Sequence, residues 1–591
     1  MCVKLDFLKK LISESDLSAA THLSEDSPLL ALISSISGIE KVNKLYDSLS
    51  PFKDLEFVNK LFEFLEIEVE LDPSELERIP KSGPFIIVTN HPFGAIDGMM
   101  LIKVIAPLRP DFKVMANFLL QHVEPIKDYF LAVNPFENKK TAYSNIAGLK
   151  KSMAHVAEGH ALGMFPAGEV SSFQMDTRSI ADKKWQSSVL KIVKKSQVPV
   201  VPIYFDGSNS RLFHLLGLVH PSLRTLTLPQ ELMRKRGKKV KLRIGKPISP
   251  TDQADFNSVE QFGRFIRAKT YALGSSFEVK KDYFKLFQTK KKPDPIAGPI
   301  DKELLKKEIQ NIEPYLLYSN DPFDCYLAPS GKIPKVIEEI GRLREITFRE
   351  VGEGTNKSRD LDEYDIYYHH LFLWDKSENE IAGSYRIGMG KDILARFGRK
   401  GFYLSSLFRL GKELNPILKQ SVELGRSFIP KEYQQKRLPL FLLWKGILTC
   451  LFNRPEYRYM IGPVSISNSY QEISRGLIIE FVRKHYFNHE LAQYVKPRNE
   501  FKVKSSNVDK EALLSATSND LRTLDKLISD IEPRSYTIPV LLKKYLHQNA
   551  RIIGFNCDPL FNNALDGLMI LDFKDIPQET LDNLNKEFKH S

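Results

Sequence analysis

The sequence has 591 residues, of which 42% are hydrophobic and 27% are charged, and lysine and arginine outnumber aspartate and glutamate by 85 to 73. A chain of this length exceeds what one hydrophobic core supports, so two or three domains are expected, and the composition excludes wholesale disorder. The net charge of +12 favours an acidic partner, namely a lipid headgroup, a nucleic acid or an acidic carrier protein, without choosing among them. The four cysteines are scattered with no C-x-x-C pair, so neither a disulfide framework nor a zinc site is indicated.

The first 80 residues are predicted to form a helical, amphipathic segment. Val58, Leu61, Phe62 and Leu65 recur at spacings of three and four residues, which places them on one helix face. Acidic residues come early and no uninterrupted apolar core is present, so we expect no signal peptide at this end.

Residues 81–278 alternate short apolar runs with helical patterns, which predicts an α/β sheet covered by helices. Helices are expected at 145–157 and 184–195. The apolar runs, which read as strands, are FIIVTN (85–90), FKVMANF (112–118), LGMFPAG (162–168), VPVVPIYF (198–205) and VKLRIG (240–245).

A linker is predicted at 279–324, because residues 279–300 hold six lysines followed by three prolines. A second mixed pattern occupies 325–576 and is followed by a tail at 577–591. Strands are expected at 364–375, 381–388, 401–409 and 457–466, and helices at 413–428, 438–452 and 469–485. Residues 505–530 are predicted to be a polar loop or a helical insert. Residues 533–573 are predicted to form a helix followed by two strands. The apolar stretch 438–452 contains Lys445 and is shorter than the roughly 20 residues of a spanning helix, so a buried helix is preferred.

The first candidate site is the block N-H-P-F-G-A-I-D-G, which begins at Asn90 where a predicted strand ends. Ligands of open α/β sheets bind at that edge. A histidine there, His91, can remove a hydroxyl proton as the oxygen attacks a thioester, and a carboxylate such as Asp97 can fix the tautomer and stabilise the imidazolium. A turn in which a histidine caps a helix explains the pair alone equally well.

Two later blocks sharpen the interpretation, namely F-P-A-G-E at 165–169 and V-P-V-V-P at 198–202. With these blocks, residues 85–250 resemble the glycerolipid (lysophospholipid) acyltransferase family. That family has N-H-x4-D, F-P-E-G-[TS] and V-P-[VI]-x-P blocks in this order. The chain departs from the pattern in two places, because Gly94 lies within a five-residue spacing between His91 and Asp97, and Ala167 stands where the family has glutamate. Such a glycine permits a bulge that would restore the aspartate to the histidine. The resemblance implies catalysis by His91 and Asp97 and substrate binding by Asn90, Phe165, Pro166, Gly168 and Glu169.

Two basic features near this site have two readings each. The segment 233–246 carries eight basic residues and no acidic one, and its alternation predicts that Lys239, Lys241 and Arg243 project from one strand face. This face is either simply solvated or a docking stripe for a lipid headgroup or carrier protein. Arg178 is likewise either a surface residue or a contact for an anionic headgroup.

The second candidate site lies in residues 340–430, where paired charges are dense. Asp362 and Asp365 are three apart before a predicted strand, and Glu423 and Arg426 are three apart on a segment expected to be helical. On charge density alone, a structural ion-pair network is the better interpretation.

The pattern of these charges, however, resembles the acyl-homoserine lactone synthases and related N-acyltransferases of the GNAT superfamily. The shared features are R-x3-F (Arg344, Phe348), D-x2-D (Asp362, Asp365), an arginine on the next strand (Arg386) and E-x2-R (Glu423, Arg426). The segments 344–355 and 539–568 resemble enzymes that make ornithine and glycine lipids. The resemblance implies that Glu423 is catalytic and that Arg344, Phe348, Asp362, Asp365, Arg386 and Arg426 bind substrate; individual roles stay open, and His369 and His370 read as structural.

Together the two resemblances imply a fold and a function. The expected fold is an N-terminal α/β acyltransferase domain with a helical N-terminal segment, joined to a C-terminal GNAT-like α+β domain. The expected function is a bifunctional acyltransferase that N-acylates ornithine or glycine with a 3-hydroxyacyl group and then O-acylates the hydroxyl of the resulting lysolipid. Acyl carrier protein, or acyl-CoA, would supply the thioester, with no metal or cofactor, and the protein would lie at the inner face of a bacterial cytoplasmic membrane on an anionic surface.

Three alternatives remain at this point. One is a lysophospholipid acyltransferase with an appended GNAT domain. Another is a nucleic-acid-binding protein, although no binding motif for nucleic acid is apparent. The third is a non-catalytic membrane-binding or lytic protein.

Overall fold

The structure is a computed structural model that describes Leu11 and residues 37–117, 120, 122–133, 142–219, 224, 226–277, 293–434, 436–502, 508–517, 520–533 and 536–582. The chain divides into two compact units. Unit 1 contains Met1–Val279 and Lys504–Ser535, and unit 2 contains Lys280–Val503 and Tyr536–Ser591. The first boundary between the units, after Val279, coincides with the start of the predicted linker. The insert near 505–530, by contrast, groups with unit 1 although it interrupts the sequence of unit 2.

Unit 1 is built on a seven-stranded sheet in the order β1-β9-β8-β2-β5-β3-β4. All neighbours are parallel except β8 and β9. The strands are β1 (Glu68–Glu70), β2 (Phe85–Thr89), β3 (Lys113–Asn117), β4 (Phe130–Val133), β5 (Ala161–Met164), β8 (Val200–Phe205) and β9 (Lys239–Ile244). Each predicted apolar run therefore overlaps a strand, and the α/β prediction is confirmed.

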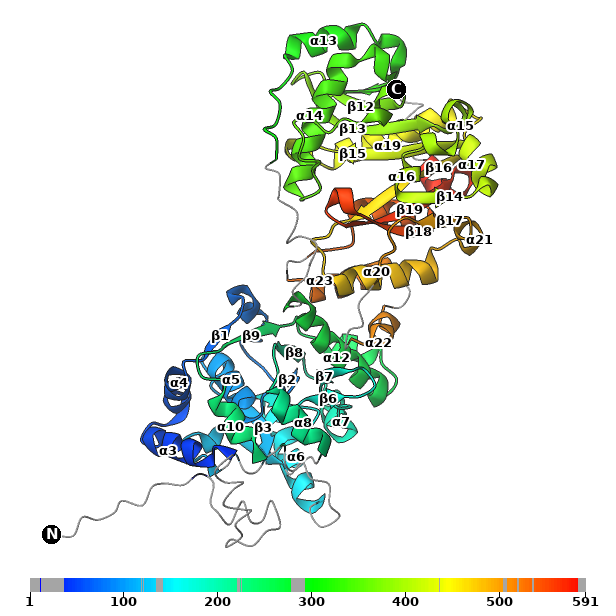
Figure 1. The fold of residues 1–591 in the computed structure, drawn as a ribbon. Coiled ribbons are helices and arrows are strands. Elements are labelled where there is room, and N and C mark those ends of the chain that lie inside the picture. Colours follow the sequence, from blue (N-terminus) through cyan, green and yellow to red (C-terminus); the bar gives the residue numbers. More distant parts are fainter. Residues whose placement is uncertain are drawn as a thin grey trace, which may run out of the picture. The chain divides into compact units, whose positions relative to one another are not determined.

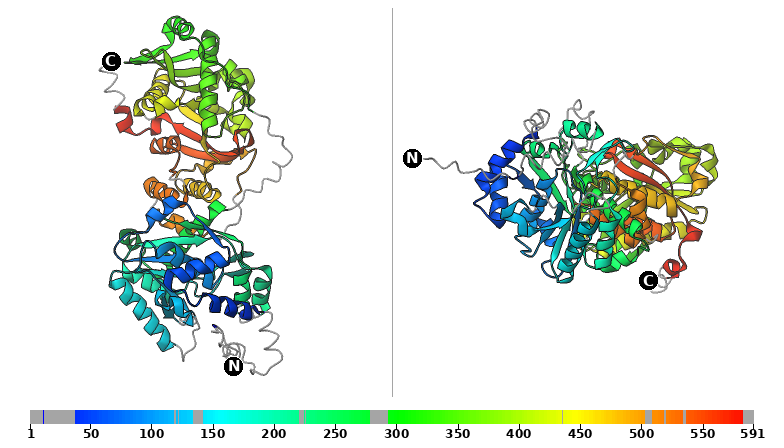
Figure 2. Two further views of the ribbon diagram at one scale, coloured as in Figure 1. Left: turned by 90° about the vertical axis from the view of Figure 1, so that its left-hand side faces the viewer. Right: turned by 90° about the horizontal axis from the view of Figure 1, so that it is seen from below.

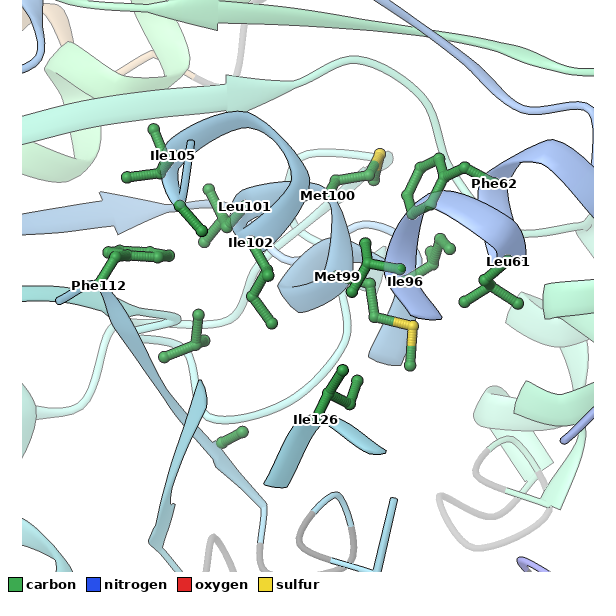
Figure 3. Packing of buried hydrophobic residues seen from close by; sticks show 14 of the residues in the cluster. Leu61, Phe62, Ile96, Met99, Met100, Leu101, Ile102, Ile105, Phe112 and Ile126 are labelled. Carbon is green, nitrogen blue, oxygen red and sulfur yellow. The ribbon is translucent and has the colours of Figure 1, made fainter. Parts of the chain in front are cut away.

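Helix α5 (Ala95–Ile105) leads directly away from the end of β2 and anchors the core of unit 1. Its buried side chains Met99 and Met100 lie on the side of α4 (Asp54–Phe64), whereas Leu101 and Ile105 lie toward Phe112, which precedes β3 (Figure 3). Helix α4 contributes Leu61 and Phe62 from the face that the sequence spacing predicts. Because α5 is apolar on nearly every side, its position, and with it that of the loop before it, is fixed by the core.

The central strand β2 lies between β5 and β8, and all three point the same way. Their carboxyl ends therefore meet at one edge of the sheet. The loops that leave this edge begin with Asn90 after β2, Phe165 after β5 and Asp206 after β8. Helices α6 (Ala142–Ala157), α7 (Ser187–Ser196) and α12 (Val259–Leu273) complete the unit (Figure 1).

The basic segment 233–246 is largely neutralised by nearby carboxylates. Arg243 is buried and pairs with Glu75 at 2.6 Å, and Lys239 pairs with Glu68 at 2.7 Å on the adjacent strand. Arg243 therefore does not project into solvent as predicted, because the first 3-10 turn after β1 brings Glu75 to its strand. These contacts favour the structural reading of the segment.

The insert forms two helices, α22 (Lys510–Ser515) and α23 (Leu521–Ile531), both packed against α12. Lys269 of α12 donates to Asp530 of α23 at 2.8 Å, and both side chains are buried, with 6% and 7% exposed. Lys246 lies 3.5 Å from the same carboxylate. A buried ammonium group is tolerated only when it is paired, so the insert supplies a charge that unit 1 requires.

Unit 2 is built on an eight-stranded sheet in the order β10-β11-β12-β13-β15-β16-β19-β18, and helices flank it (Figure 2). Its strands are β10 (Leu316–Asn320), β11 (Phe323–Pro329), β12 (His369–Asp375), β13 (Glu380–Met389), β15 (Ser421–Phe428), β16 (Tyr459–Ile466), β18 (Arg551–Asp558) and β19 (Ala564–Asp572). The pairing of β15 with β16 is parallel, and it covers three residue pairs from Ser421–Tyr459 to Glu423–Ile461. The mixed helix and strand content agrees with the predicted α+β domain.

Two predictions in unit 2 are wrong. The expected helix at 413–428 is a short helix α17 (Asn415–Lys419) followed by strand β15, because Val422 and Leu424 alternate with polar residues at a period of two. The expected strand at 401–409 is mostly a turn and the short helix α16 (Leu404–Leu407), followed by β14 (Phe408–Leu410). Glu423 and Arg426 therefore lie on a strand, where a bulge and a positive φ of 50° at Arg426 reorient the second side chain.

The apolar stretch after residue 437 forms the predicted helix, α19 (Arg437–Phe452), which packs against β12 and β13. Leu442, Leu443 and Ile447 are buried there. Among the residues that the structure describes, none of the helices combines the length and the apolar character needed to cross a bilayer.

We predict that Asp530→Ala destabilises unit 1 by about 3–5 kcal/mol, because the buried Lys269 would lose its closest partner. The measurement is urea unfolding of the full chain followed by Trp185 fluorescence, with Trp374 and Trp444 replaced by phenylalanine. The matched control is Lys526→Met, which removes the exposed pair with Asp252 and should cost about 1 kcal/mol or less. Equal effects of the two substitutions would contradict the prediction.

Candidate functional site

The first site is centred on the pair His91 and Asp97. Nδ1 of His91 lies 2.8 Å from Oδ2 of Asp97, whose side chain is fully buried, while 17% of the His91 side chain is exposed. The same carboxylate oxygen accepts the backbone N–H groups of Phe93 at 2.9 Å and Gly94 at 3.1 Å. Because Nδ1 of His91 faces this oxygen, a ring that donates its Nδ1–H to Asp97 leaves Nε2 free as a hydrogen-bond acceptor.

Gly94 makes this contact possible despite the five-residue spacing. Its φ of 106° and ψ of −136° belong to a region that only glycine adopts readily, and it precedes the first turn of α5, on which Asp97 lies. A Cβ atom at this position would also come within 3.1 Å of the Leu228 side chain. The turn therefore returns Asp97 to the histidine, as the sequence predicts.

Asn90 fixes the start of the loop to the neighbouring strand. Its side-chain nitrogen donates to the carbonyl of Phe205 at 2.9 Å, and its side-chain oxygen accepts the Phe205 N–H at 2.8 Å. Both ends of the amide are thus engaged by the end of β8. The geometry gives Asn90 a positioning role, while the substrate contact expected from the sequence stays a prediction.

The block after β5 lies against His91. The ring of Phe165 packs on the imidazole with centroids 4.2 Å apart, and Gly168 adopts a φ of 71° beside the Gln186 side chain. The carbonyl of Pro166 accepts the Gln186 N–H at 2.8 Å. This block forms one wall of the histidine site.

The carboxylate of Glu169 forms ion pairs with two basic side chains. It pairs with Arg224 at 2.7 Å and with Lys183 at 2.8 Å. Arg178 lies apart from this cluster, exposed in the turn between β6 (Ser172–Gln174) and β7 (Ser179–Ala181). Substrate binding by either residue stays a prediction.

Asp182 is a residue of this site that the sequence did not reveal. Its carboxylate accepts the backbone N–H of His91 at 3.2 Å, the Ser171 hydroxyl at 2.5 Å and the Trp185 indole at 3.0 Å. The Ser171 N–H in turn donates to the His91 carbonyl at 2.8 Å. Burial raises the pKa of Asp182, and the donors oppose this shift. The peptide of His91 is therefore held on both sides by groups that only the fold brings together, and no sequence spacing signals them.

The second site is a buried network of arginines and aspartates on one face of the sheet in unit 2. Arg344 of α14 (Pro334–Glu350) lies 2.8 Å from Asp360 and 3.0 Å from Asp365. Arg386 of β13 contacts Asp362 and Asp365 at 2.5 and 3.3 Å, and Arg426 lies 3.3 Å from Asp362. The structure thus brings five of the predicted residues together, and adds Asp360, which the sequence motif omits.

The charges in this network are stabilised by one another. Burial alone would raise the pKa of Asp365, but Arg344 and Arg386 hold it well below its usual range. Burial lowers the pKa of the adjacent His370 to about 4, so this side chain is neutral at pH 7. Phe348 lies at the edge of the network, where its ring meets that of Phe561 with centroids 6.5 Å apart.

Glu423 lies on the same sheet face as Arg386, because Gly388 pairs with Glu423 and Gly425 with Arg386. It accepts a very short hydrogen bond from the Tyr368 hydroxyl and the backbone N–H groups of Tyr403 at 3.2 Å and Leu404 at 2.8 Å. Burial raises its pKa to about 7, and the donors limit the shift. A carboxylate with this pKa can accept a proton near neutral pH.

Three tyrosine rings enclose the Arg386 guanidinium, namely Tyr364, Tyr368 and Tyr403, at 5.3–5.4 Å. Sequence reasoning did not select them, although Tyr364, Tyr367 and Tyr368 are closely spaced in the sequence. Such rings stabilise a cation away from water. They also bury the groups around Glu423.

Two further carboxylates that were not predicted, Asp558 and Asp566, lie on β18 and β19. Asp566 pairs with Ser465 across β19 and β16, and accepts its hydroxyl at 2.6 Å. Burial raises the pKa of Asp566 to about 7, and burial also raises the pKa of Asp558. Both acids lie in the segment that resembles lipid N-acyltransferases.

Two protein families match the chain in the order of its two units. Residues 10–280 match the family described as acyltransferase, and residues 343–444 match the acetyltransferase (GNAT) domain. The first match spans the His91 site, and the second spans the network from Arg344 to Arg426.

Individual relatives carry names for two kinds of acyl transfer. The "Glycine N(alpha)-acyltransferase" of Bacteroides thetaiotaomicron is 32% identical over 287 residues, covering 46% of this chain and 77% of that protein. The "Lyso-glycine lipid O-acyltransferase" of Phocaeicola vulgatus is 27% identical over 226 residues, covering 37% of this chain and 78% of that protein. The "L-ornithine N(alpha)-acyltransferase" of Agrobacterium fabrum is 36% identical over 110 residues, covering 18% of this chain and 36% of that protein. The chain therefore belongs to the family of the Bacteroides thetaiotaomicron acyltransferase, and it is an acyl-transferring enzyme.

Proposed function

We propose that this chain makes an aminoacyl lipid in two steps, with one step assigned to each unit. Unit 2 would N-acylate a small amino acid, glycine or ornithine, with a 3-hydroxyacyl group taken from a thioester. Unit 1 would then O-acylate the free hydroxyl of that lysolipid. The observation that carries the proposal is that one chain holds both the His91–Asp97 pair and the Arg386–Glu423 network, and that its relatives are named separately for the two reactions.

The N-acylation step requires a neutral amine and a held carboxylate. In the proposed reaction, the amine nitrogen attacks the thioester carbonyl and its proton passes to Glu423. The carbon–sulfur bond then breaks, and the leaving thiolate takes the proton from Glu423 to give the free thiol. Arg386 or Arg426 would bind the amino acid's carboxylate, since guanidinium groups match that geometry. The buried position of Glu423 and its raised pKa support the role of proton acceptor.

The O-acylation step requires only one activated hydroxyl. Nε2 of His91 would take the hydroxyl proton as the oxygen attacks the second thioester, while Asp97 stabilises the imidazolium that forms. The carbon–sulfur bond would then break, and the imidazolium would return the proton to the leaving thiolate. No serine nucleophile is needed, because the lysolipid supplies the hydroxyl. Arg224 and Lys183 already pair with Glu169, so neither cation is reserved for a phosphate group. This pairing fits an acceptor that carries no phosphate, as in aminoacyl lipids.

The donor, partners and location follow from the same proposal. Acyl carrier protein is the preferred thioester donor, because an acidic carrier suits a chain with a net charge of +12. The lysolipid requires access to a bilayer, so we propose peripheral attachment at the inner face of the bacterial cytoplasmic membrane. No metal or organic cofactor takes part in either proposed step.

Mass spectrometry of lipids from a bacterial host that lacks aminoacyl lipids tests the proposal. Expression of the chain should produce a diacylated aminoacyl lipid, and growth on isotope-labelled glycine or ornithine should identify the amino acid. His91→Ala should accumulate the mono-acylated lysolipid, because only the second step is lost. Glu423→Gln should abolish both products.

The control variant is His160→Ala, which alters a partly exposed histidine of unit 1 outside the site and should give the wild-type lipid pattern. A host that shows only altered phospholipids would contradict the two-step proposal. So would a diacylated product that persists in the His91→Ala variant.

We further predict that kcat for N-acylation rises with pH and levels off above about 7. Burial raises the pKa of Glu423 to about 7, so the ionised form that accepts the proton predominates only above this pH. The measurement is kcat against pH at saturating amino acid and thioester. Glu423→Gln should lower kcat by about 10²–10⁴ and remove this limb of the profile.

Glu345→Gln is the matched control, because Glu345 is also a buried carboxylate of unit 2 but is engaged by Arg349 and Thr355. This variant should retain the limb near pH 7. A wild-type profile that is flat between pH 5.5 and 8, or a limb that survives in Glu423→Gln, would refute the assignment of Glu423.

A further inference from the structure

Helix α8 (Arg211–Val219) presents an apolar face to solvent. Leu212, Leu215 and Leu218 recur every three residues and are 49%, 59% and 53% exposed. Met175, 74% exposed, follows β6, the strand against which α8 packs (Figure 1). Several large apolar side chains exposed at helical spacing indicate an interaction surface rather than chance exposure.

The opposite face of α8 is connected to the histidine site. Phe213 is buried, and the Arg224 guanidinium that pairs with Glu169 lies 5.7 Å from its ring. Just before the helix, the side-chain nitrogen of Asn209 donates to the carbonyl of Phe93 at 3.3 Å, in the loop between His91 and Asp97. A surface bound to the outer face would therefore lie beside the loop that holds the catalytic pair.

The charges around α8 favour an anionic partner. The helix contains no acidic residue. Arg211 is exposed, and none of the described carboxylates lies within 4 Å of its guanidinium. Arg234, 43% exposed, pairs with Glu231 at 2.8 Å and donates to the Ser210 hydroxyl, so Arg211 is the cation of this region that has no carboxylate partner among the described residues. Apolar side chains that insert between acyl chains, flanked by cations that meet phosphate groups, are the features of a helix that lies in a bilayer interface.

We propose that the outer face of α8 is the surface by which unit 1 docks on an anionic phospholipid bilayer, and so meets its lipid acceptor. The inference rests on the proposed O-acylation of a lysolipid, and it names the element that reaches the membrane. Leu212, Leu215 and Leu218 would enter the acyl-chain boundary, and Arg211 would meet the headgroups.

Sedimentation of the full chain with vesicles tests the proposal. The vesicles contain equal parts of phosphatidylglycerol and phosphatidylcholine, and pure phosphatidylcholine vesicles serve for comparison. The double variant Leu215→Gln/Leu218→Gln should bind the anionic vesicles roughly tenfold more weakly or worse, because two partly exposed leucines no longer gain from leaving water. Arg211→Gln should weaken binding to anionic vesicles but not to neutral ones.

The matched control is Leu108→Gln/Met153→Gln, which alters two exposed apolar residues of unit 1 outside α8. This control should bind vesicles as the wild type does. All variants change exposed side chains, and thermal unfolding of each checks that the fold is retained.

Three results would overturn the proposal. The wild type could fail to bind anionic vesicles, or the α8 variant could bind them as the control does. The third is a dimer in analytical ultracentrifugation that the α8 substitutions convert to a monomer without changing vesicle binding, since the face would then join two copies of the chain.

A parallel assay separates this proposal from the proposed function. With a short-chain, water-soluble hydroxyl acceptor, the α8 variant should retain wild-type O-acylation, and with the acceptor embedded in vesicles it should lose it. A wild type that acylates neither acceptor but still binds vesicles through α8 would refute the O-acylation and leave the docking surface supported. Equal losses with both acceptors would refute the docking role.

Discussion

The contact between Nδ1 of His91 and the buried carboxylate of Asp97 is the interaction on which the site of unit 1 depends. It exists because three features of the fold agree. Strand β2 ends at the centre of a mostly parallel sheet, Gly94 turns the chain through a conformation that other residues avoid, and the apolar helix α5 fixes Asp97 one turn later. Before the turn, Asp182 accepts the His91 N–H, and the Asn90 side chain binds the backbone of Phe205 at the end of β8. A small change in any of these supports would move the imidazole relative to its carboxylate.

The site of unit 2 contains several charged side chains that are buried away from solvent. Each arginine of the network has at least one aspartate within 3.3 Å, and tyrosine rings surround Arg386. Glu423 differs from Asp365 because its donors are a tyrosine hydroxyl and backbone N–H groups, so burial raises its pKa to about 7, whereas Arg344 and Arg386 hold the pKa of Asp365 well below its usual range. Glu423 can thus exchange a proton near pH 7, while Asp365 stays ionised.

Elements whose apolar residues recur at a clear period could be predicted from the sequence. Elements whose conformation depends on tertiary contacts could not. The buried parallel strands of unit 1 were found because apolar runs of this length and spacing have few alternatives. The segment of Glu423 was taken for a helix, because a charged pair three residues apart also fits a helix face, yet the strand places both residues beside Arg386. Asp182, Asp360 and Asp566 could not be selected from sequence, since each acts through a partner that is remote in the chain or lies outside any motif.

The protonation of His91 tests the central claim most directly. NMR of the full chain with ¹⁵N-labelled histidine, with the His91 signals identified by their loss in His91→Ala, reports which ring nitrogen carries the proton. At a pH where the ring is neutral, the account predicts the proton on Nδ1 and a free Nε2, and a mixture of tautomers in Asp97→Asn. A proton on Nε2 in the wild type, or spectra unchanged by Asp97→Asn, would contradict the claim that the carboxylate prepares this histidine as a base.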